Sequence, residues 1–231
     1  MQKILIAVAL FAWSMSVAAR PVSILVYQVW EKGIEPYISR VMVTPDYVRL
    51  DEGGSADGFT LFDRQQEILY TVSMEDRSVL VMNPTQPVPD GSSSVILQEE
   101  VKVDDKAPQV AGKQPKTVRL LANGETCSEM VVIEGVMDEA VEALGELKLA
   151  LARIQAATLD AVPLNMRTPC DLAANVYAAD RSYRFGLPLS ERSEGRSQSL
   201  IDFAPDHEAD DELFTLPEGF SRRAVFAPGT I

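Results

Sequence analysis

Two cysteines, Cys127 and Cys170, carry the plainest chemical signal in the chain. No Cys-x-x-Cys pair is present and the single histidine is distant in the sequence, which removes the usual activating partners of a reactive thiol. Unactivated thiols in an oxidising compartment form disulfides, whereas a redox-active or nucleophilic cysteine needs an activating neighbour. We therefore predict a Cys127–Cys170 disulfide.

The single histidine, His207, stands within the acidic stretch 205–212. A Ser-His-Asp hydrolase needs a nucleophile beside this histidine, and the chain has no Gly-x-Ser-x-Gly sequence. The imidazole and the carboxylates around it could hold a divalent metal, but one histidine gives no zinc pattern and consecutive acids in a loop are usually solvated. We expect residues 205–212 to form an acidic loop without a catalytic or metal site.

Other acidic residues also fail to define a site. The chain has 34 Asp and Glu residues, so a pair at glycosidase spacing can always be chosen and carries no information. Segment 51–58 differs from a calcium-binding EF-hand loop, because Gly53 stands third and Ala56 sixth, where that loop needs an oxygen ligand and a glycine. Phosphate-binding and dinucleotide-binding glycine motifs are missing too. We therefore expect no cofactor and no enzymatic activity.

The first 19 residues have the three parts of a secretory signal peptide. Lys3 gives a short positive start, residues 4–13 are apolar, and small residues precede Arg20. The alternative is an uncleaved anchor, but this apolar run is shorter than the roughly 20 residues that a spanning helix needs. We expect a signal peptide over 1–19, a mature chain without a membrane span, and a periplasmic location.

The net charge of the chain limits the classes of partner that it can bind. Its formal net charge is −13 and no basic stripe interrupts the acidic composition, so we expect no nucleic-acid binding. A 46% hydrophobic composition over roughly 210 mature residues is enough for one sizeable core. We expect a single domain over 20–220 and a flexible tail over 221–231.

Segment 37–82 predicts the central part of the fold. Short runs of β-branched, aromatic and aliphatic residues alternate there with tight polar turns, and short loops between strands favour antiparallel neighbours. The predicted strands are 37–43, 46–51, 59–64, 68–74 and 77–82, preceded by one at 21–30. Further strands are expected at 95–103, 117–122, 127–134 and 199–203, with a linker over 83–94 and either a short strand or a helical turn over 170–178.

One segment has helical periodicity. Its apolar residues recur in steps of three and four, while most charged residues, including Lys148, fall elsewhere. The recurring positions are Met137, Val141, Leu144, Leu147, Leu151 and Ile154. We predict one long amphipathic helix over 137–160, ended by Pro163.

The predicted helix must cover the predicted sheet. A meander of this length buries its apolar face most simply by curving around the helix, which creates a concave surface that is either filled by protein or open to a ligand. The side chains that we expect to line this surface or to contact the helix are Phe59, Leu61, Ile68, Tyr70, Val72, Leu144 and Leu151.

Four stretches carry a resemblance to a known family: RVMVTPDYVRLD, GFTLFDR, ILYTVSMEDRSVLVM and the closing LFTLPEGF. They resemble a family of uncharacterised bacterial secreted proteins whose domain is similar to the LolA-like lipoprotein-carrier superfamily. The resemblance covers about the first third of the mature chain, with the last stretch as a second anchor. It implies a mainly β (α+β) fold, a curved antiparallel half-open barrel capped by helices, whose concave face binds acyl chains.

Carriers of this superfamily open and close through an arrangement of arginines and helices whose positions do not map onto this chain. We expect Arg40 and Arg49 instead to pair with Asp51, Asp63 or Glu52 at the sheet surface. The functional hypothesis is a non-catalytic binding protein for a lipid, an acylated protein or an apolar peptide. The alternative is a structural or interaction protein of the cell envelope with a filled barrel and a protein partner.

Overall fold

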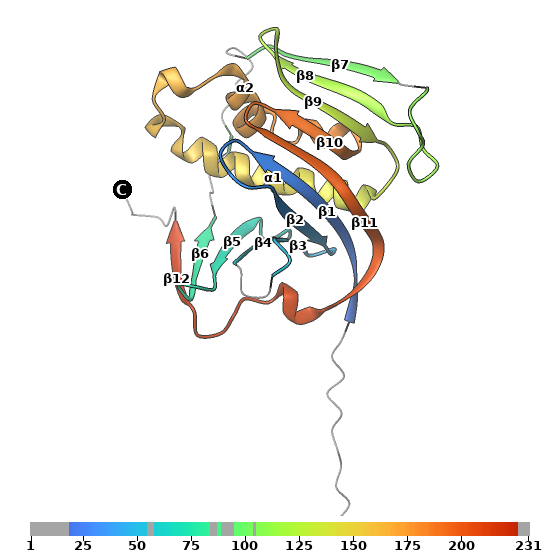
Figure 1. The fold of residues 1–231 in the computed structure, drawn as a ribbon. Helices are drawn as coiled ribbons and strands as arrows, with labels where there is room; N and C mark the ends of the chain where they lie inside the picture. Colours follow the sequence, from blue (N-terminus) through green and yellow to red (C-terminus); the bar gives the residue numbers. More distant parts are fainter. Residues whose placement is uncertain (1–18, 55–57, 84–86, 89–94, 104, 226–231) are drawn as a thin grey trace, which may run out of the picture.

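The computed structural model describes residues 19–54, 58–83, 87–88, 95–103 and 105–225 (Figure 1). The predicted signal peptide lies outside the described residues except for Ala19, as do residues 226–231 and parts of segments 51–58 and 83–94. Within the described ranges, no helix combines the length and the apolar character needed to span a membrane.

The strands form a single open sheet. Its order is β12-β6-β5-β4-β3-β2-β1-β11-β10-β9-β8-β7, and the neighbours are antiparallel except β12 and β6, which are parallel. The bounds are β1 (Ala19–Glu31), β2 (Tyr37–Val43), β3 (Tyr47–Asp51), β4 (Phe59–Asp63), β5 (Ile68–Ser73), β6 (Ser78–Met82), β7 (Leu97–Val103), β8 (Lys116–Ala122), β9 (Glu125–Ile133), β10 (Leu187–Ser193), β11 (Arg196–Asp210) and β12 (Ser221–Val225). Strands β2 to β6 are consecutive in both chain and sheet, which confirms the predicted meander.

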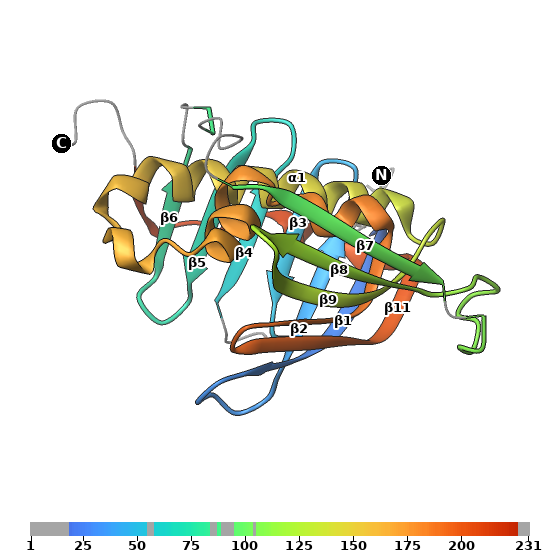
Figure 2. The ribbon, with the colours of Figure 1, turned by 90° about the horizontal axis from the view of Figure 1, so that it is seen from above.

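The sheet bends around helix α1 (Asp138–Thr158), which confirms a mainly β fold with one long helix (Figures 1 and 2). We call the side of the sheet that faces α1 the concave side and the other the convex side. Buried side chains of α1 and of β1 to β5 form one apolar cluster on the concave side. Its strand members include Leu25, Tyr27, Val29, Val41, Val43, Val48, Phe62 and Leu69, and its helix members include Val141, Leu144 and Leu147. Side chains therefore fill the space between α1 and these strands.

Ion pairs tie α1 to the turn between β4 and β5. Arg64 donates from Nε and Nη2 to the two carboxylate oxygens of Glu146, at 2.6 and 3.0 Å. Arg153 lies 3.0 Å from Glu67 on the same turn. Bidentate pairing of a guanidinium with a carboxylate restricts orientation, so α1 is held in place on the sheet.

The C-terminal segment covers the convex side. Residues 211–220, which include the 3-10 turn η5 (Asp211–Phe214), pass from β11 to β12 beneath β1 to β6 (Figure 1). Phe214 is buried and stacks on Tyr47, with ring centroids 6.3 Å apart. The cluster also contains Val22, Met42, Phe59, Leu61, Val72 and Val79. The stretch LFTLPEGF therefore closes a second core.

A buried charge cluster lies on the same convex side. Asp51 accepts hydrogen bonds from Nε of Arg40 and from Nε of Arg49, both at 2.8 Å, so the two arginines do pair with a carboxylate as expected. Asp51 and Arg49 are buried rather than at the sheet surface, because residues 211–220 cover this side, and Arg49 also donates from Nη1 to the backbone oxygen of Leu213 in that segment. Its guanidinium lies 3.7 Å from the ring centroid of Phe59.

Short helical segments cover the far end of the concave side. They are η1 (Leu159–Ala161), η2 (Leu164–Met166), α2 (Pro169–Leu172), the π-helical turn η3 (Ala173–Tyr177) and η4 (Arg181–Phe185). Segment 170–178 is thus helical. The predicted disulfide is confirmed: Cys127 on β9 and Cys170 on α2 are joined, with their Cα atoms 5.1 Å apart.

Two expectations about the C-terminal part are corrected. The acidic stretch 205–212 is not a loop up to Asp210, because β11 continues through it and pairs with the start of β1, where His207 faces Val22. Pro205 is accommodated at a register shift in this pairing. The expected flexible tail is ordered over Ser221–Val225, where β12 pairs with β6.

Candidate functional site

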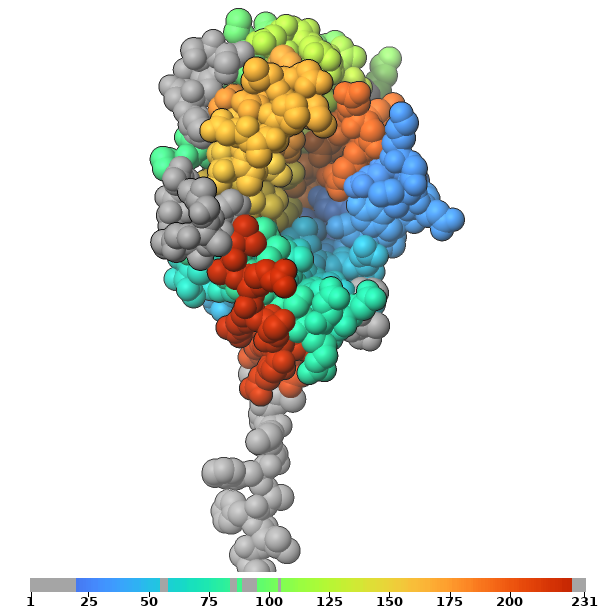
Figure 3. Space-filling view, turned by 90° about the vertical axis from the view of Figure 1, so that its left-hand side faces the viewer, coloured from blue at the N-terminus to red at the C-terminus, as the bar shows by residue number. Residues whose placement is uncertain are grey.

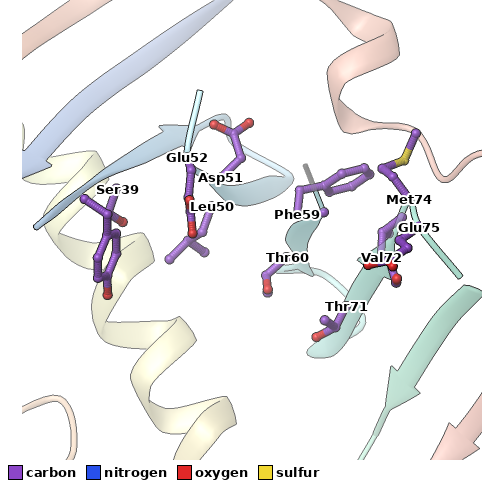
Figure 4. A pocket seen from close by; sticks show the side chains of 13 residues that line it. Ser39, Leu50, Asp51, Glu52, Phe59, Thr60, Thr71, Val72, Met74 and Glu75 are labelled. Atoms are coloured by element: carbon purple, nitrogen blue, oxygen red, sulfur yellow. The ribbon is translucent and has the colours of Figure 1, made fainter. Parts of the chain in front are cut away.

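A hollow of about 570 Å³ lies on β2 to β5, and we call it the strand groove. Tyr37, Ser39, Leu50, Thr60 and Thr71 project into it, and their positions on the strands place them on the concave side. Figure 4 shows labelled side chains of the groove on successive strands, with α1 to one side. The groove therefore includes concave-side surface of β2 to β5 that α1 leaves uncovered, and it reaches the strand ends, where Phe59 and Val72 of the convex cluster also line it.

The groove has a mixed lining. Phe59, Val72 and Met74 add apolar surface at one end, and the carboxylates of Glu52 and Glu75 stand at the margin. Apolar surface with a few polar groups is typical of small-molecule sites, whose volumes run from roughly 300 to 1,000 Å³.

A second hollow, of about 300 Å³, lies between α1, the short helices and strands β8 to β11. We call it the lysine hollow, because Lys148 of α1 lines it. Glu191 and Arg196 face it from the sheet, and Arg181 and the Cys127–Cys170 disulfide line it from the far end. The disulfide therefore holds part of the wall of this hollow.

The charge of Lys148 is uncompensated at close range. Within the described ranges, no carboxylate lies within 4.0 Å of its ammonium group, although the side chain is half-buried. Burial lowers the pKa of Lys148, the negative charge of Glu191 opposes this shift, and Arg196 adds to it. Glu191 itself accepts a hydrogen bond from Nε2 of Gln198 at 3.0 Å. The lysine hollow thus contains a cation that an anion could neutralise.

Arg181 provides a second cation deeper in the wall. Its side chain is buried, donates from Nη1 to the backbone oxygen of Leu121 at 3.1 Å, and lies 4.0 Å from Glu99. Burial lowers the pKa of this guanidinium, although arginine keeps its charge at every physiological pH. Asp171, Glu191 and Glu194 are also in the lining, so negative charge is present as well.

A hydrogen-bonded chain connects the two hollows. Glu31, at the end of β1, accepts from the hydroxyl of Tyr37 at 2.8 Å and from Nε of Arg196 at 3.1 Å. The hydrogen bond from Tyr37 is the main reason that the pKa of Glu31 is lowered. Tyr37 lines the strand groove and Arg196 lines the lysine hollow. In Figure 3 the surface is hollowed between α1, the strands β10 and β11, and the strands β1 and β2.

Two tyrosines lie near the apolar cluster below this chain. Burial raises the pKa of Tyr183 strongly, and Glu191 adds to the shift. Burial also raises the pKa of Tyr27, whose hydroxyl donates to the backbone oxygen of Pro188 at 3.2 Å. Both hydroxyls therefore remain protonated and can serve only as hydrogen-bonding groups.

Neither hollow brings a serine together with the histidine. The serines of the lysine hollow have no histidine among the lining residues, and His207 is exposed on β11, where it pairs with β1. A search of the described residues found no cluster of three or more potential metal ligands. The hollows present apolar surface, hydroxyl groups and both cationic and carboxylate groups.

The seven predicted site residues do not lie together. Leu144 and Leu151 belong to the concave cluster around α1, whereas Phe59, Leu61, Tyr70 and Val72 belong to the convex cluster under residues 211–220. Ile68 is half-buried on β5, on the same face of the strand as Tyr70 and Val72. Because these strands are apolar on both faces, parity alone could not decide which face meets the helix. Phe62 and Leu69 are the residues that meet it.

Sequence analysis missed the polar residues of the site. Glu31 and Tyr37 stand at the adjoining ends of β1 and β2, whereas Glu191 and Arg196 lie on β10 and β11 far along the chain, and no local pattern links the two pairs. Lys148 was expected outside the apolar stripe of the helix, but it stands four positions after Leu144 and three before Leu151, and so lies within the buried stripe.

Comparisons with known proteins give little guidance. No family model and no curated protein matches this chain. Among solved structures, it is similar to an uncharacterized conserved protein from Thermus thermophilus, with a TM-score of 0.45 and 8% identity over 88% of this chain and 90% of the other.

Proposed function

We propose that this protein is a non-catalytic periplasmic binding protein for an amphipathic ligand, such as a lipid, an acylated protein or an apolar peptide that carries an acidic group. The observation behind the proposal is the half-buried Lys148, which has no carboxylate within 4.0 Å among the described residues and lines the lysine hollow, which the Tyr37–Glu31–Arg196 chain links to the strand groove. A ligand with an acidic end and an apolar body would complement both features.

The apolar body of the ligand would occupy the strand groove. Leu50, Phe59 and Met74 offer apolar contact there, while the threonines of β4 and β5 offer hydroxyl groups. Burial of apolar surface contributes about 25 cal/mol per Å², so a single acyl chain that is half-buried in the groove would bind measurably.

The acidic end would lie in the lysine hollow. A carboxylate or phosphate beside Lys148 would neutralise an ammonium group that burial disfavours, and hydrogen bonds between charged partners are the strong ones. Arg196 already binds Glu31, so it would contribute a second donor only by sharing its guanidinium.

The cellular setting is part of the proposal. A Cys127–Cys170 disulfide suits an oxidising compartment, and an open curved sheet with a covering helix suits a LolA-like half-open barrel. Transport or shielding of an acylated ligand between envelope components would fit a protein of this kind.

Paired acyl-chain fluorophores test the proposal, one with a carboxylate head and one with an uncharged amide head. We expect both to bind and lipid displacement to release them. Lys148→Gln should weaken the carboxylate probe by about tenfold and leave the amide probe unchanged, because a charged hydrogen bond contributes about 1.5 kcal/mol or more. Thr71→Trp should block both probes by filling the groove, and Thr126→Trp, exposed on β9 outside both hollows, is the matched control.

Native mass spectrometry of the protein after mild extraction provides an independent measurement, since a bound lipid adds its mass. Absence of both co-purified lipid and displaceable probe would overturn the proposal. Equal binding by the Thr71→Trp variant and the wild type would place any binding outside the strand groove.

The second candidate is a structural or interaction protein of the cell envelope. The observation that favours it is the apolar cluster between α1 and β1 to β5, which leaves the central strands covered by the protein's own helix. In that case the strands are a scaffold, and neither probe should bind to a correctly folded chain.

A further inference from the structure

Strand β7 is an edge of the sheet. Among the described residues it pairs with β8 alone, and all seven of its residues are exposed. Leu97 is 40% exposed, Val101 48% and Val103 55%, and the preceding Ile96 is 67% exposed. The apolar side chains of this edge therefore face solvent on a strand whose outer backbone groups have no neighbour in the sheet.

Natural sheets usually protect such an edge. Proline, a bulge, a very short strand, charged side chains or a covering element disfavours the addition of another strand, and of these β7 carries charged side chains, Glu99, Glu100 and Lys102, whose charges an added strand must match. β7 has no proline, and its pairing with β8 runs without a register shift over Leu97–Val103. A regular edge of this length can accept a further strand.

The charges beside this edge alternate in sign. On the convex side, Glu129 of β9 pairs with Arg119 of β8 at 2.8 Å, and Arg119 lies 3.8 Å from Glu100 of β7. This row of charges, Glu129, Arg119 and Glu100, ends at the edge strand. A strand that paired with β7 would place a side chain beside Glu100 on the same face. Lys102, on the same face of β7, has no ion pair within the described part of the chain.

We propose that β7 pairs antiparallel with β7 of a second copy of this chain, about a two-fold axis at Val101. A two-fold axis normal to the sheet leaves every side chain on the same face of the joined sheet. Residues directly opposite each other in an antiparallel pair also share a face, so the axis must pass through a residue and not between two residues. An axis at Glu99 or Glu100 would bring two carboxylates face to face, and one at Lys102 would oppose two ammonium groups. An axis at Val101 places Glu100 opposite the partner's Lys102, twice, with valine against valine between them.

This self-association goes beyond ligand binding. In the order of the sheet, five strands separate β7 from β2, the nearest strand of the strand groove, so pairing at this edge leaves the groove accessible. It would join two open sheets into one continuous sheet and remove both β7 edges from solvent.

Charge reversal tests the partner and the register together. We expect the mature wild-type chain to show a concentration-dependent monomer–dimer equilibrium in sedimentation velocity and light scattering. Glu100→Lys and Lys102→Glu should each weaken the dimer by about tenfold or more, because two attractive cross-strand pairs become repulsive. An equal mixture of the two variants should dimerise at least as strongly as the wild type, since every facing pair is then of opposite sign.

A matched control separates this effect from net charge. Glu208→Lys makes the same change of charge as Glu100→Lys on exposed β11, which three strands separate from β7 in the sheet order, and should leave the equilibrium unchanged. Circular dichroism checks that each variant is folded, and recovery on mixing provides a second check. A wild-type chain that stays monomeric throughout, or a dimer that either reversal leaves intact, would overturn the proposal.

Discussion

Replacement of Asp51 by asparagine tests how the convex side is held together. The side chain of Asp51 is 1% exposed and accepts hydrogen bonds from Arg40, from Arg49 and from the backbone amide of Gly53. Asparagine keeps the shape and one acceptor oxygen but removes the negative charge. The substitution therefore leaves the buried guanidinium of Arg49 without its counter-ion.

The cost follows from the two arginines. Removing one partner of a buried ion pair usually costs about 3–5 kcal/mol, because the other charge stays buried. The side chain of Arg40 is 31% exposed and can be hydrated, whereas Arg49 keeps its hydrogen bond to Leu213 and its contact with Phe59. We expect a loss near the lower end of that range, about 3 kcal/mol in the free energy of unfolding.

The pH dependence gives the prediction a second readout. Burial by itself raises the pKa of Asp51, but the hydrogen bonds from Arg40 and Arg49 outweigh it and leave the pKa below its ordinary value. A carboxylate with a lowered pKa stabilises the fold fully above its unfolded pKa of about 3.9, and this stabilisation is lost as the pH falls through the folded pKa. The difference between wild type and Asp51→Asn should therefore be constant near neutral pH and shrink below about pH 4.

Urea unfolding followed by far-UV circular dichroism, repeated at intervals from about pH 3 to about pH 8, measures both quantities. Glu52→Gln is the matched control, since Glu52 is adjacent and exposed, and it should change the free energy by less than about 0.5 kcal/mol. A loss below about 1 kcal/mol for Asp51→Asn, or a difference that does not shrink in acid, would refute the reasoning.

Three further predictions concern other parts of the fold. Phe214→Ala should cost about 3 kcal/mol and increase binding of a hydrophobic dye, because it opens the cover of the convex cluster; unchanged urea unfolding would contradict this. Replacing both Cys127 and Cys170 by serine should lower the free energy of unfolding by about 4 kcal/mol in the chain-entropy model for a separation of 43 residues. A double variant as stable as the wild type under non-reducing conditions would argue against this. Gly186→Ala should cost on the order of 2 kcal/mol or more, because φ is +106° and an added Cβ would lie 2.2 Å from a backbone oxygen of β9. Gly195→Ala, with φ +76° and open space around it, should cost less, and equal thermal shifts would rule out the steric account.

Local patterns were enough to predict several elements of this protein. The spacing of Val141, Leu144, Leu147 and Leu151 is a property of one helix and needs no distant partner, so α1 was predicted within about two residues of its bounds. The meander was predictable for the same reason, since its turns join strands that are neighbours in the chain. The disulfide followed from having two cysteines.

Long-range pairing decided what local patterns could not. The polarity around His207 favoured a loop, but β1 supplies the hydrogen-bonding partner that makes this stretch a strand. The start of the expected tail is likewise ordered, because Ser221–Val225 add to the edge at β6. Backbone hydrogen bonds to a distant strand leave no trace in local composition.

The candidate site shows the same division. Residue types gave the apolar faces of β4 and β5, but only the tertiary fold decided that Phe62 and Leu69 meet α1 while Phe59 and Val72 face the C-terminal segment. Lys148 lies in the buried stripe of its helix, yet its lack of a close counter-ion depends on which strands end beside it. Amphipathic periodicity tells how a segment can be buried, whereas the partner that buries it is a property of the whole chain.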